Sequence, residues 1–235
     1  MPSSPDRLVL VCGTGTEVGK TWVAARLLEE LRGRGFAVAA RKPAQSFDVD
    51  LEADRLGERT DAEVLGAASG EDPDVVCLPA RSYHRAMAPP MAAELLGLPP
   101  FTVGDLVDEL RWPVPPVAVG LVETAGGVRS PQASDGDSID LGRLLRPAIV
   151  LLVADAGLGT INDVRLSAEA LAGLTGDGNG TDGPPPRLVV ALNRFDAEHD
   201  LHQRNRHWLT ERYGFEVVAM PEGVSHLADL VMKDH

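Results

Sequence analysis

The chain has 235 residues, of which 44% are hydrophobic, and its formal net charge is −13 at pH 7. This length and apolar content suffice for one α/β domain with a full core, so we expect a single domain over residues 1–235. The acidic balance argues against sequence-independent binding to nucleic acid or to an anionic membrane, because such binding depends on clustered lysine and arginine. No apolar run approaches the roughly 20 residues of a membrane span. The N-terminus lacks the basic start and apolar core of a signal peptide, so we expect a cytoplasmic protein.

Short apolar runs alternate with helical patterns along the chain, which is typical of parallel strands buried on both faces of a sheet. Amphipathic helices are expected over residues 21–34 and 161–174, where apolar side chains recur at helical spacing. We therefore predict an α/β fold with a doubly wound, mainly parallel seven-stranded sheet, helices on both faces and a ligand at the carboxyl ends of the strands. The expected strands lie at residues 8–12, 38–42, 75–78, 117–123, 149–154, 188–193 and 216–219.

A glycine-rich motif follows the first expected strand and reads Gly-Thr-Gly-Thr-Glu-Val-Gly-Lys-Thr over residues 13–21. Strand, loop, Gly-Lys-Thr and helix in this order indicate a phosphate-binding loop and a fold of the P-loop NTPase type. Lys20 would reach the β- and γ-phosphates, and the Thr21 hydroxyl a Mg²⁺ ion. Thr14 stands where the usual spacing has its first glycine, so a plain strand-to-helix turn is the alternative. The residues expected to hold the nucleotide are Gly13, Thr14, Gly15, Glu17, Val18, Gly19, Lys20 and Thr21.

Polar clusters also follow five other expected strands, at the edge where a doubly wound sheet binds its ligands. Lys42 precedes Pro43, which holds it in extended geometry facing the phosphates. Glu123 precedes small residues and suits Mg²⁺, which takes one or two carboxylates together with phosphate oxygens and water. Residues 155–162 form a glycine-rich turn that opens a helix, and their backbone N–H groups make a second anion site. The residues placed to meet the base or ribose are Asn193, Arg194, Pro221 and Glu222.

Each of these residues has an ordinary structural alternative. Lys42 could be a solvated lysine at a strand end, Glu123 could cap a turn, and Asn193 could form an Asx turn. Asp61 follows Thr60 at the expected start of a helix, where an acidic residue in the first turn needs no ligand to explain it. The prediction of a site therefore depends on the joint placement of these side chains at one edge of the sheet.

Taken in chain order, the motifs resemble those of the dethiobiotin synthetase family. The resemblance implies a homodimeric, ATP- and Mg²⁺-dependent cyclo-ligase of biotin biosynthesis. Such an enzyme closes a cyclic urea on 7,8-diaminopelargonic acid with CO₂, through a mixed carbamic–phosphoric anhydride. Because the matching segments run over nearly the whole chain, the resemblance is more specific than a phosphate loop alone. The segments are residues 13–21, 42–46, 61, 122–127 and 158–162.

The resemblance also assigns roles to individual residues. It implies magnesium ligands at Thr21, Asp61 and Glu123. Carbamate, γ-phosphate and departing ADP repel one another, so cationic and polar groups must converge on them. The side chains implied for this are Lys20, Lys42, Thr16 and Ser46. The substrate carboxylate would be held by the partner subunit, on the backbone amides of Leu158, Gly159, Thr160, Ile161 and Asn162.

Several alternatives to this interpretation stay open. Thr124 and Phe47 add bulk where the family usually has glycine, so a related diamine or another carboxylate acceptor is possible. A ParA/MinD-like ATPase switch is the alternative from a different class, but such proteins carry a lysine near the start of the phosphate loop, and residues 13–15 hold none. A related P-loop synthetase is another alternative. The residues do not distinguish ATP from CTP or GTP.

Overall fold

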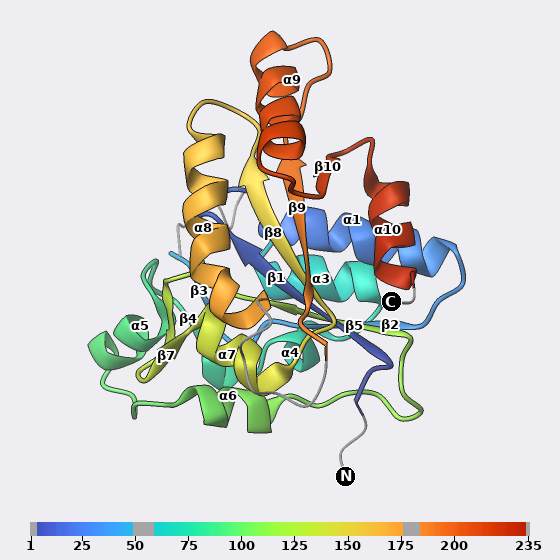
Figure 1. The fold of residues 1–235 in the computed structure, drawn as a ribbon. Helices are drawn as coiled ribbons and strands as arrows, with labels where there is room; N and C mark the ends of the chain where they lie inside the picture. The colour runs from blue at the N-terminus through green and yellow to red at the C-terminus, as the bar shows by residue number, and fades with distance from the viewer. Residues whose placement is uncertain (1–3, 49–58, 176–183, 234–235) are drawn as a thin grey trace.

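The computed structural model describes residues 4–48, 59–175 and 184–233. Within these residues, six parallel strands form one sheet in the order β10, β9, β8, β1, β5, β2 (Figure 1). Helices lie on both faces of this sheet, so the doubly wound α/β class is confirmed. The strands are β1 (Arg7–Gly13), β2 (Val38–Arg41), β5 (Val119–Glu123), β8 (Ile149–Asp155), β9 (Arg187–Asn193) and β10 (Val217–Ala219).

The helices form two layers. One layer packs on the sheet through the first hydrophobic cluster and contains α1 (Lys20–Gly33), α3 (Asp61–Ser69), α4 (Pro73–Val76) and α10 (Val224–Met232). The opposite layer contains α5 (Pro89–Leu95), α6 (Val103–Glu109), α7 (Ser138–Leu145) and α8 (Thr160–Thr175). The remaining short helices are η1 (Pro79–Arg81), α9 (Asp200–His207) and η2 (Trp208–Arg212).

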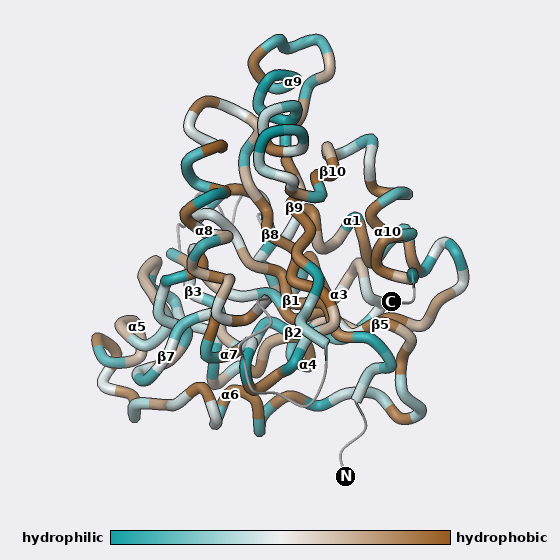
Figure 2. The backbone as a smooth tube through the Cα atoms, in the orientation of Figure 1, coloured by the Kyte–Doolittle hydropathy of each residue, from teal (hydrophilic) through white to brown (hydrophobic). Residues whose placement is uncertain are grey.

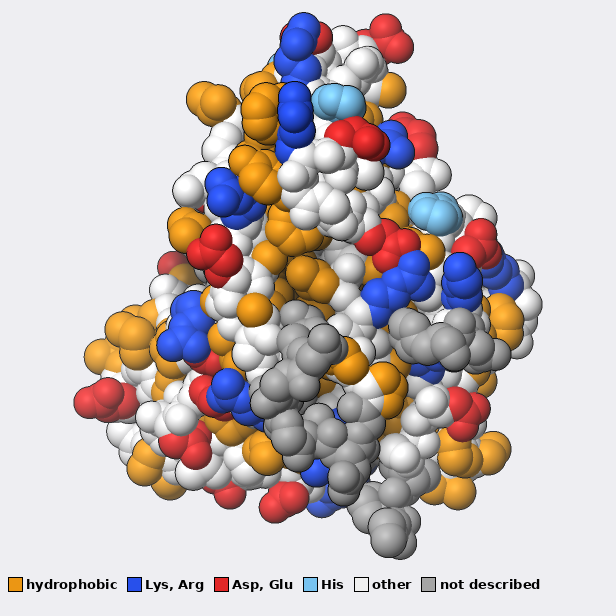
Figure 3. Space-filling view, viewed as in Figure 1, with side chains coloured by type: hydrophobic (Ala, Val, Ile, Leu, Met, Phe, Trp, Pro, Cys, Tyr) orange, Lys and Arg blue, Asp and Glu red, His pale blue; other side chains and the backbone are white. Residues whose placement is uncertain are grey.

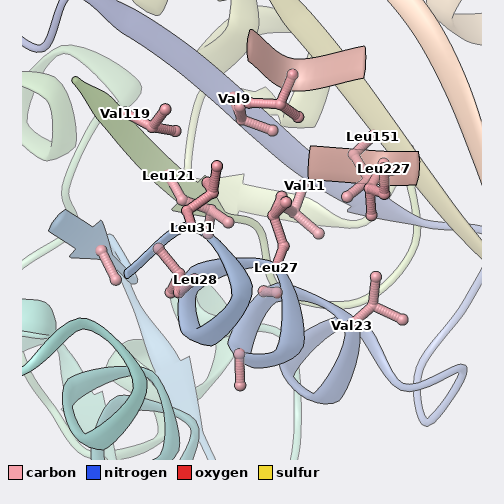
Figure 4. Packing of buried hydrophobic residues seen from close by; sticks show 14 of the residues in the cluster. Val9, Val11, Val23, Leu27, Leu28, Leu31, Val119, Leu121, Leu151 and Leu227 are labelled. Carbon is pink, nitrogen blue, oxygen red and sulfur yellow. The ribbon is translucent and has the colours of Figure 1, made fainter. Parts of the chain in front are cut away.

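Strand β1 lies between these two layers and contributes to both cores. Val9 and Val11 belong to the cluster under α1, whereas Leu10 and Cys12 belong to the opposite cluster, and all four are 0% exposed. Figure 4 shows Val11 facing Leu27 of α1. Full burial of such side chains stabilises the fold by roughly 1.5–3 kcal/mol each. The loop that leaves the carboxyl end of β1 is therefore attached to a strand that is buried on both faces of the sheet.

The prediction of a seventh strand at residues 75–78 is wrong. Residues 73–76 instead form α4, which begins with Pro73 after Asp72. The Asp72 carboxylate accepts from the backbone N–H of Asp74, so a side-chain cap and a first-position proline together start a helix. Val75 is 45% exposed, which is incompatible with the fully buried strand expected from the apolar run.

Two short pairings lie outside the main sheet. Strand β3 (Gln45–Ser46) pairs in parallel with β4 (Ser82–Tyr83), and β6 (Pro131–Ala133) pairs antiparallel with β7 (Gly136–Asp137). Because β3 begins three residues after Lys42, its pairing with β4 fixes the course of the chain beyond β2.

The carboxyl ends of the main strands meet at one edge because all six run in the same direction. In Figure 1, β9 ends at this edge toward α9. Figure 2 shows hydrophobic residues concentrated in the strands and hydrophilic residues in α9. Among the described helices, none combines the length and apolar character needed to cross a bilayer.

Candidate active site

The loop between β1 and α1 is shaped by close contacts that only glycine permits. Gly19 precedes α1 with a φ of 89°, in the left-handed region that glycine adopts readily. A Cβ on Gly19 would lie 2.0 Å from Asn193 Nδ2, and a Cβ on Gly13 would lie 2.9 Å from the Gly15 carbonyl oxygen. These contacts explain why glycine stands at both ends of the motif even though Thr14 replaces the usual first glycine.

The Lys20 side chain lies inside this loop. It is 7% exposed, and its Nζ donates to the Gly15 carbonyl oxygen over 2.9 Å. Burial lowers the pKa of Lys20, and the nearby Lys42 charge lowers it further. Thr14 and Val18 are half-buried, and Thr16 and Glu17 are exposed.

Lys42 lies at the centre of an ion cluster at the carboxyl edge of the sheet. Its Nζ donates to Glu123 Oε1 over 2.6 Å and lies 2.7 Å from Asp61 Oδ2. The Thr21 hydroxyl lies 2.7 Å from Asp61 Oδ1 and 2.8 Å from Glu123 Oε1. These side chains come from α1, the end of β2, the start of α3 and the end of β5. The structure thus brings together four of the residues that the sequence singled out.

The charges in this cluster support one another. Burial alone lowers the pKa of Lys42, but the adjacent Asp61 and Glu123 raise it overall, so the ammonium stays charged. Burial likewise acts to raise the pKa of Asp61, but Lys42 and Thr21 bring it below its usual value. The pKa of Glu123, which is 0% exposed, is raised by burial despite Lys42. The cluster therefore holds a charged lysine between a solvent-accessible carboxylate and a sealed one.

The donor chemistry of the cluster suits a divalent cation. Glu123 Oε2 is buried and has no hydrogen-bond partner within the described residues. Leaving such an oxygen unsatisfied costs about 1–3 kcal/mol or more. Mg²⁺ prefers carboxylate, hydroxyl and phosphate oxygens. Thr21, Asp61 and Glu123 thus fit a magnesium ion by their donor atoms, and the orphaned oxygen points to a ligand.

Asp61 is positioned by the start of α3. Thr60 caps this helix in a capping box with Glu63, so the first turn is satisfied without the Asp61 side chain. Gln45 Oε1 accepts from the backbone N–H of Ala62 over 3.0 Å and ties the same turn to β3. The Asp61 carboxylate is therefore free to face Lys42 and Thr21, and the residue that caps the helix is Thr60.

Thr124 and Phe47, the two side chains that depart from the family pattern, contact neighbouring residues of the protein. Thr124 is 0% exposed, and its hydroxyl donates to the Val11 carbonyl over 3.2 Å. The Phe47 ring packs edge-on against His84, with ring centroids 4.9 Å apart. Ser46, a neighbour of Phe47, donates its hydroxyl to the Met87 carbonyl over 2.5 Å. The bulk of Thr124 is therefore accommodated in the interior beneath β1.

Two side chains hold the start of the turn between β8 and α8. One lies at the end of β8 and the other on α9. Asp155 Oδ1 accepts from the backbone N–H of Gly157 over 2.8 Å. Asn205 Nδ2 donates to the carbonyls of Ala156 and Gly157, each over 2.9 Å. These hydrogen bonds from Asp155 and Asn205 fix the backbone just before the residues predicted to bind a carboxylate.

Beyond this base, the predicted carboxylate-binding residues are largely open to solvent. Leu158 is 92% exposed, and Gly159 and Asn162 are exposed as well. Ile161 is half-buried. Thr160 is 3% exposed, and its hydroxyl has no hydrogen-bond partner among the described residues. The turn therefore presents backbone and apolar surface outward.

The end of β9 is tied to the phosphate loop. Asn193 Nδ2 donates to the Val18 carbonyl over 3.0 Å. Arg194, which has a φ of 54°, donates to the Glu17 carbonyl and to the Asp155 carboxylate, each over 2.7 Å. Asn193 and Arg194 thus link the end of β9 to the loop after β1 and to the end of β8. The other base or ribose candidates, Pro221 and Glu222, are exposed just beyond β10, the strand next to β9.

The sequence analysis gave no individual role to three residues that shape the site. Gln45 lies within the motif at 42–46, and its position beside Ser46 is the only local signal that could have found it. Asn205 carries no such signal, because it reaches the β8–α8 turn from a helix far along the chain. Asp155 was placed at the start of the turn, but its contact with Arg194 depends on the neighbouring strand order.

The profile of the AAA domain family matches residues 7–220. The chain is 38% identical over 196 residues to the ATP-dependent dethiobiotin synthetase BioD of Parafrankia sp. (strain EAN1pec), a match that covers 81% of this chain and 78% of that protein. It is 34% identical over 193 residues to the protein of the same name from Corynebacterium efficiens, which covers 79% of this chain and 81% of that protein.

Solved structures with the same fold are more distant in sequence. The signal recognition particle receptor FtsY from Elizabethkingia anophelis matches with a TM-score of 0.50 at 14% identity, covering 98% of this chain and 67% of that one. A plasmid partition protein from Borrelia burgdorferi also matches with a TM-score of 0.50 at 14% identity, covering 98% and 97%. At this identity the likeness shows the fold alone. The relatives from Parafrankia and Corynebacterium show more: the chain belongs to the ATP-dependent dethiobiotin synthetase family.

Proposed function

We propose that this chain closes the cyclic urea of dethiobiotin on 7,8-diaminopelargonic acid with CO₂ and Mg-ATP, at the carboxyl edge of its sheet. The observation that carries the proposal is the buried cluster in which Lys42 contacts both Asp61 and Glu123, with Thr21 bridging the same carboxylates. ATP-dependent dethiobiotin synthesis is the activity of the family. The assignment of individual residues to its steps follows from the resemblance of the motifs, and the geometry of the cluster supports it.

The reaction needs three covalent events. One amine of the substrate adds to CO₂ and loses a proton, which gives a carbamate. A carbamate oxygen attacks the γ-phosphorus of ATP, and ADP leaves. The second amine then attacks the carbonyl carbon of the mixed anhydride and loses a proton, and phosphate leaves as the ring closes. Negative charge is concentrated in the second event, so catalysis depends on cations already oriented toward the transferring group.

The two buried lysines supply this charge. Lys20 is held by the Gly15 carbonyl, which it can exchange for a phosphate oxygen of the nucleotide. Lys42 carries a charge fixed by its carboxylate partners and lies where the carbamate and γ-phosphate would meet. Mg²⁺, when bound by Thr21, Asp61 and Glu123, would neutralise charge on the β- and γ-phosphates. Thr16 and Ser46 would line the phosphate and carbamate. The nucleoside would be contacted by Asn193, Arg194, Pro221 and Glu222.

The substrate carboxylate would bind the turn at residues 158–162 of a second copy, so the working form is a homodimer. Support comes from exposed apolar side chains on this turn, on α8 and on η2: Leu158 is 92%, Leu166 59% and Trp208 46% exposed. Figure 3 shows hydrophobic side chains beside arginines over the α8 and α9 part of the surface. We further propose that residues 1–235 act as one cytoplasmic domain.

The test is product formation from defined reactants. Purified protein incubated with ATP, Mg²⁺, bicarbonate and 7,8-diaminopelargonic acid should give dethiobiotin and ADP in equal amounts, measured by mass spectrometry. Omitting the diamine should abolish most ADP release. ADP release that is independent of the diamine, with no dethiobiotin, would instead indicate a P-loop ATPase acting in another role.

A further inference from the structure

The Lys42 ammonium lies between the two carboxylates that suit a divalent cation. Its Nζ is 2.6 Å from Glu123 Oε1 and 2.7 Å from Asp61 Oδ2, and the residue is 3% exposed. By contrast, Lys20 Nζ contacts the Gly15 carbonyl of its own loop. Only one of the two site lysines therefore bridges the carboxylates.

The cluster is not electrically balanced by this lysine. Asp61 and Glu123 together carry two negative charges, of which Lys42 balances one by direct contact while Lys20 acts on both only through space. Glu123 Oε2 still has no partner within the described residues. A divalent ion would balance both carboxylates. It would also strongly repel an ammonium a few ångströms away in a poorly solvated site. Lys42 and a divalent ion therefore compete for the same carboxylate oxygens.

A displaced Lys42 needs another anion, because an unpaired buried ammonium is costly. Without a nucleotide, the described residues around Lys42 offer it Asp61, Glu123 and the Thr124 carbonyl at 3.4 Å. The phosphates of a bound nucleotide would supply the missing anion on the side of Lys20. The cation would enter past Asp61, whose side chain is 41% exposed, since Glu123 is sealed at 0%.

We propose that Lys42 acts as a resident cation that keeps divalent metal out of the Asp61–Glu123 site until a nucleotide draws its ammonium away. Metal would then bind together with the nucleotide rather than before it. This inference rests on the part of the proposed function that places a divalent ion at Asp61 and Glu123. It concerns an exchange of contacts by a side chain of this protein and requires no turnover.

The first experiment measures Mn²⁺ binding to nucleotide-free protein by electron paramagnetic resonance. The variant Lys42→Met removes the ammonium and keeps an unbranched apolar stem, and it should bind Mn²⁺ at least about tenfold more tightly than the wild type. Lys20→Met is the matched comparison, because Lys20 contacts the Gly15 carbonyl and acts on both carboxylates only through space. It should therefore tighten Mn²⁺ binding clearly less than Lys42→Met does. Equal Mn²⁺ affinity in the wild type and Lys42→Met would overturn the proposal.

The second experiment uses the wild type and stays informative if Lys42→Met does not fold. The chain has three lysines, Lys20, Lys42 and Lys233, so lysine labelled with ¹³C at Cε gives few signals to assign. Mg²⁺ alone should leave the Lys42 signal in place. Mg²⁺ with adenylyl imidodiphosphate should shift it, while the exposed Lys233 serves as a reference. A Lys42 signal that moves with Mg²⁺ alone, or stays fixed when both are added, would contradict the proposal.

These outcomes separate the inference from the proposed function. A wild type that makes no dethiobiotin but shows the predicted metal and lysine responses would refute the proposed reaction and retain the resident cation. A wild type that makes dethiobiotin but binds Mn²⁺ without nucleotide as tightly as Lys42→Met would retain the reaction and refute the resident cation.

Discussion

The cluster around Lys42 and the turn at residues 158–162 lie at the same edge of the sheet but differ in almost every physical respect. The cluster is closed by contacts of 2.6–2.8 Å among side chains from four segments of one chain. The turn is firmly held only at its base, by Asp155 and Asn205, and its Leu158 side chain is 92% exposed.

The contrast indicates which half of the proposed site one chain completes by itself. The half proposed to bind phosphate and metal is assembled within one chain, because buried charges must be paired to be tolerated. The half assigned to the substrate carboxylate is open and apolar at its rim, as expected for a surface that another copy covers. The two halves should therefore respond differently to substitution.

The largest expected effect comes from the closed half. Lys42→Met should reduce dethiobiotin turnover at least about 100-fold, because it removes a charge that stabilises the transferring phosphoryl group. Nucleotide affinity, measured by calorimetry without added metal, should change only a few-fold, since Lys20 and the loop backbone remain.

Arg204→Ala is a suitable control for this variant. Arg204 pairs with the exposed Asp200 on α9 and lies outside the cluster. It should leave turnover nearly unchanged. Turnover of Lys42→Met within a few-fold of the wild type would show that Lys42 does not act on the transferring group.

A mixture of variants tests whether the open half serves the other copy. Gly159 has a φ of 98°, so Gly159→Val should distort the turn while leaving the Lys42 cluster intact. When Gly159→Val protein is mixed with Lys42→Met protein, each hybrid dimer would contain one complete site. That site would combine the Lys42 cluster of the first chain with the intact turn of the second. After subunit exchange, activity should recover to about a quarter of the wild-type value, since half of the dimers are hybrids with one working site each. Proven exchange without recovery would place the turn in its own chain's site.

A smaller effect is expected where the two halves meet. Arg194 links the Glu17 carbonyl to Asp155, and its side-chain contacts are partly exposed. Arg194→Ala should weaken nucleotide binding about 3- to 10-fold, as expected for the loss of about 1 kcal/mol of charge-assisted hydrogen bonding. Arg204→Ala is again the comparison. Unchanged affinity would mean that the loop holds its shape without this link.

A further prediction concerns stability in alkali, not activity, and returns to the buried interior around the closed half. Burial raises the pKa of Cys12 and of Cys77 from 9.0 to about 12. The unfolded chain therefore loses these protons first, so the stability they contribute is complete below pH 9 and falls as pH rises toward 12. The free energy of unfolding should drop by about 1.4 kcal/mol per pH unit for each thiol in this window.

Denaturant unfolding between pH 8 and 10 measures this slope, and the double variant Cys12→Ala, Cys77→Ala supplies the comparison. The variant should be less stable at pH 8 because it leaves small cavities. Its stability should nevertheless depend less steeply on pH. Identical slopes would show that the thiols are not protected from ionisation in the folded protein.

The sequence predicted those parts of the molecule that depend on local pattern. Each of these parts is a short motif next to a strand or helix that the spacing of hydrophobic residues reveals. They are the glycines at 13 and 19, the helix from Lys20 and the polar residues at strand ends. The order of parallel strands then explains how Lys42 and Glu123 come together, since β2 and β5 are neighbours in the sheet.

The sequence was less informative where one local signal competed with another. The apolar residues at 75–78 indicated a strand, but Asp72 and Pro73 start a helix, and the cap prevailed over the hydrophobic run. Nor could a pattern show that the Lys42 ammonium bridges both carboxylates, because that contact depends on three strand and helix ends meeting in space. The support from Asn205 likewise depends on how α9 folds back on the turn.

In the reaction proposed for the closed half, the γ-phosphoryl group of ATP is transferred to a carbamate oxygen. A single turnover started with C¹⁸O₂ in ordinary water tests this directly, because ring closure breaks the bond between carbon and the oxygen that attacked phosphorus. Mass spectrometry should find ¹⁸O from CO₂ in the released phosphate, together with dethiobiotin. Dethiobiotin formed with phosphate that carries no ¹⁸O would contradict the claim.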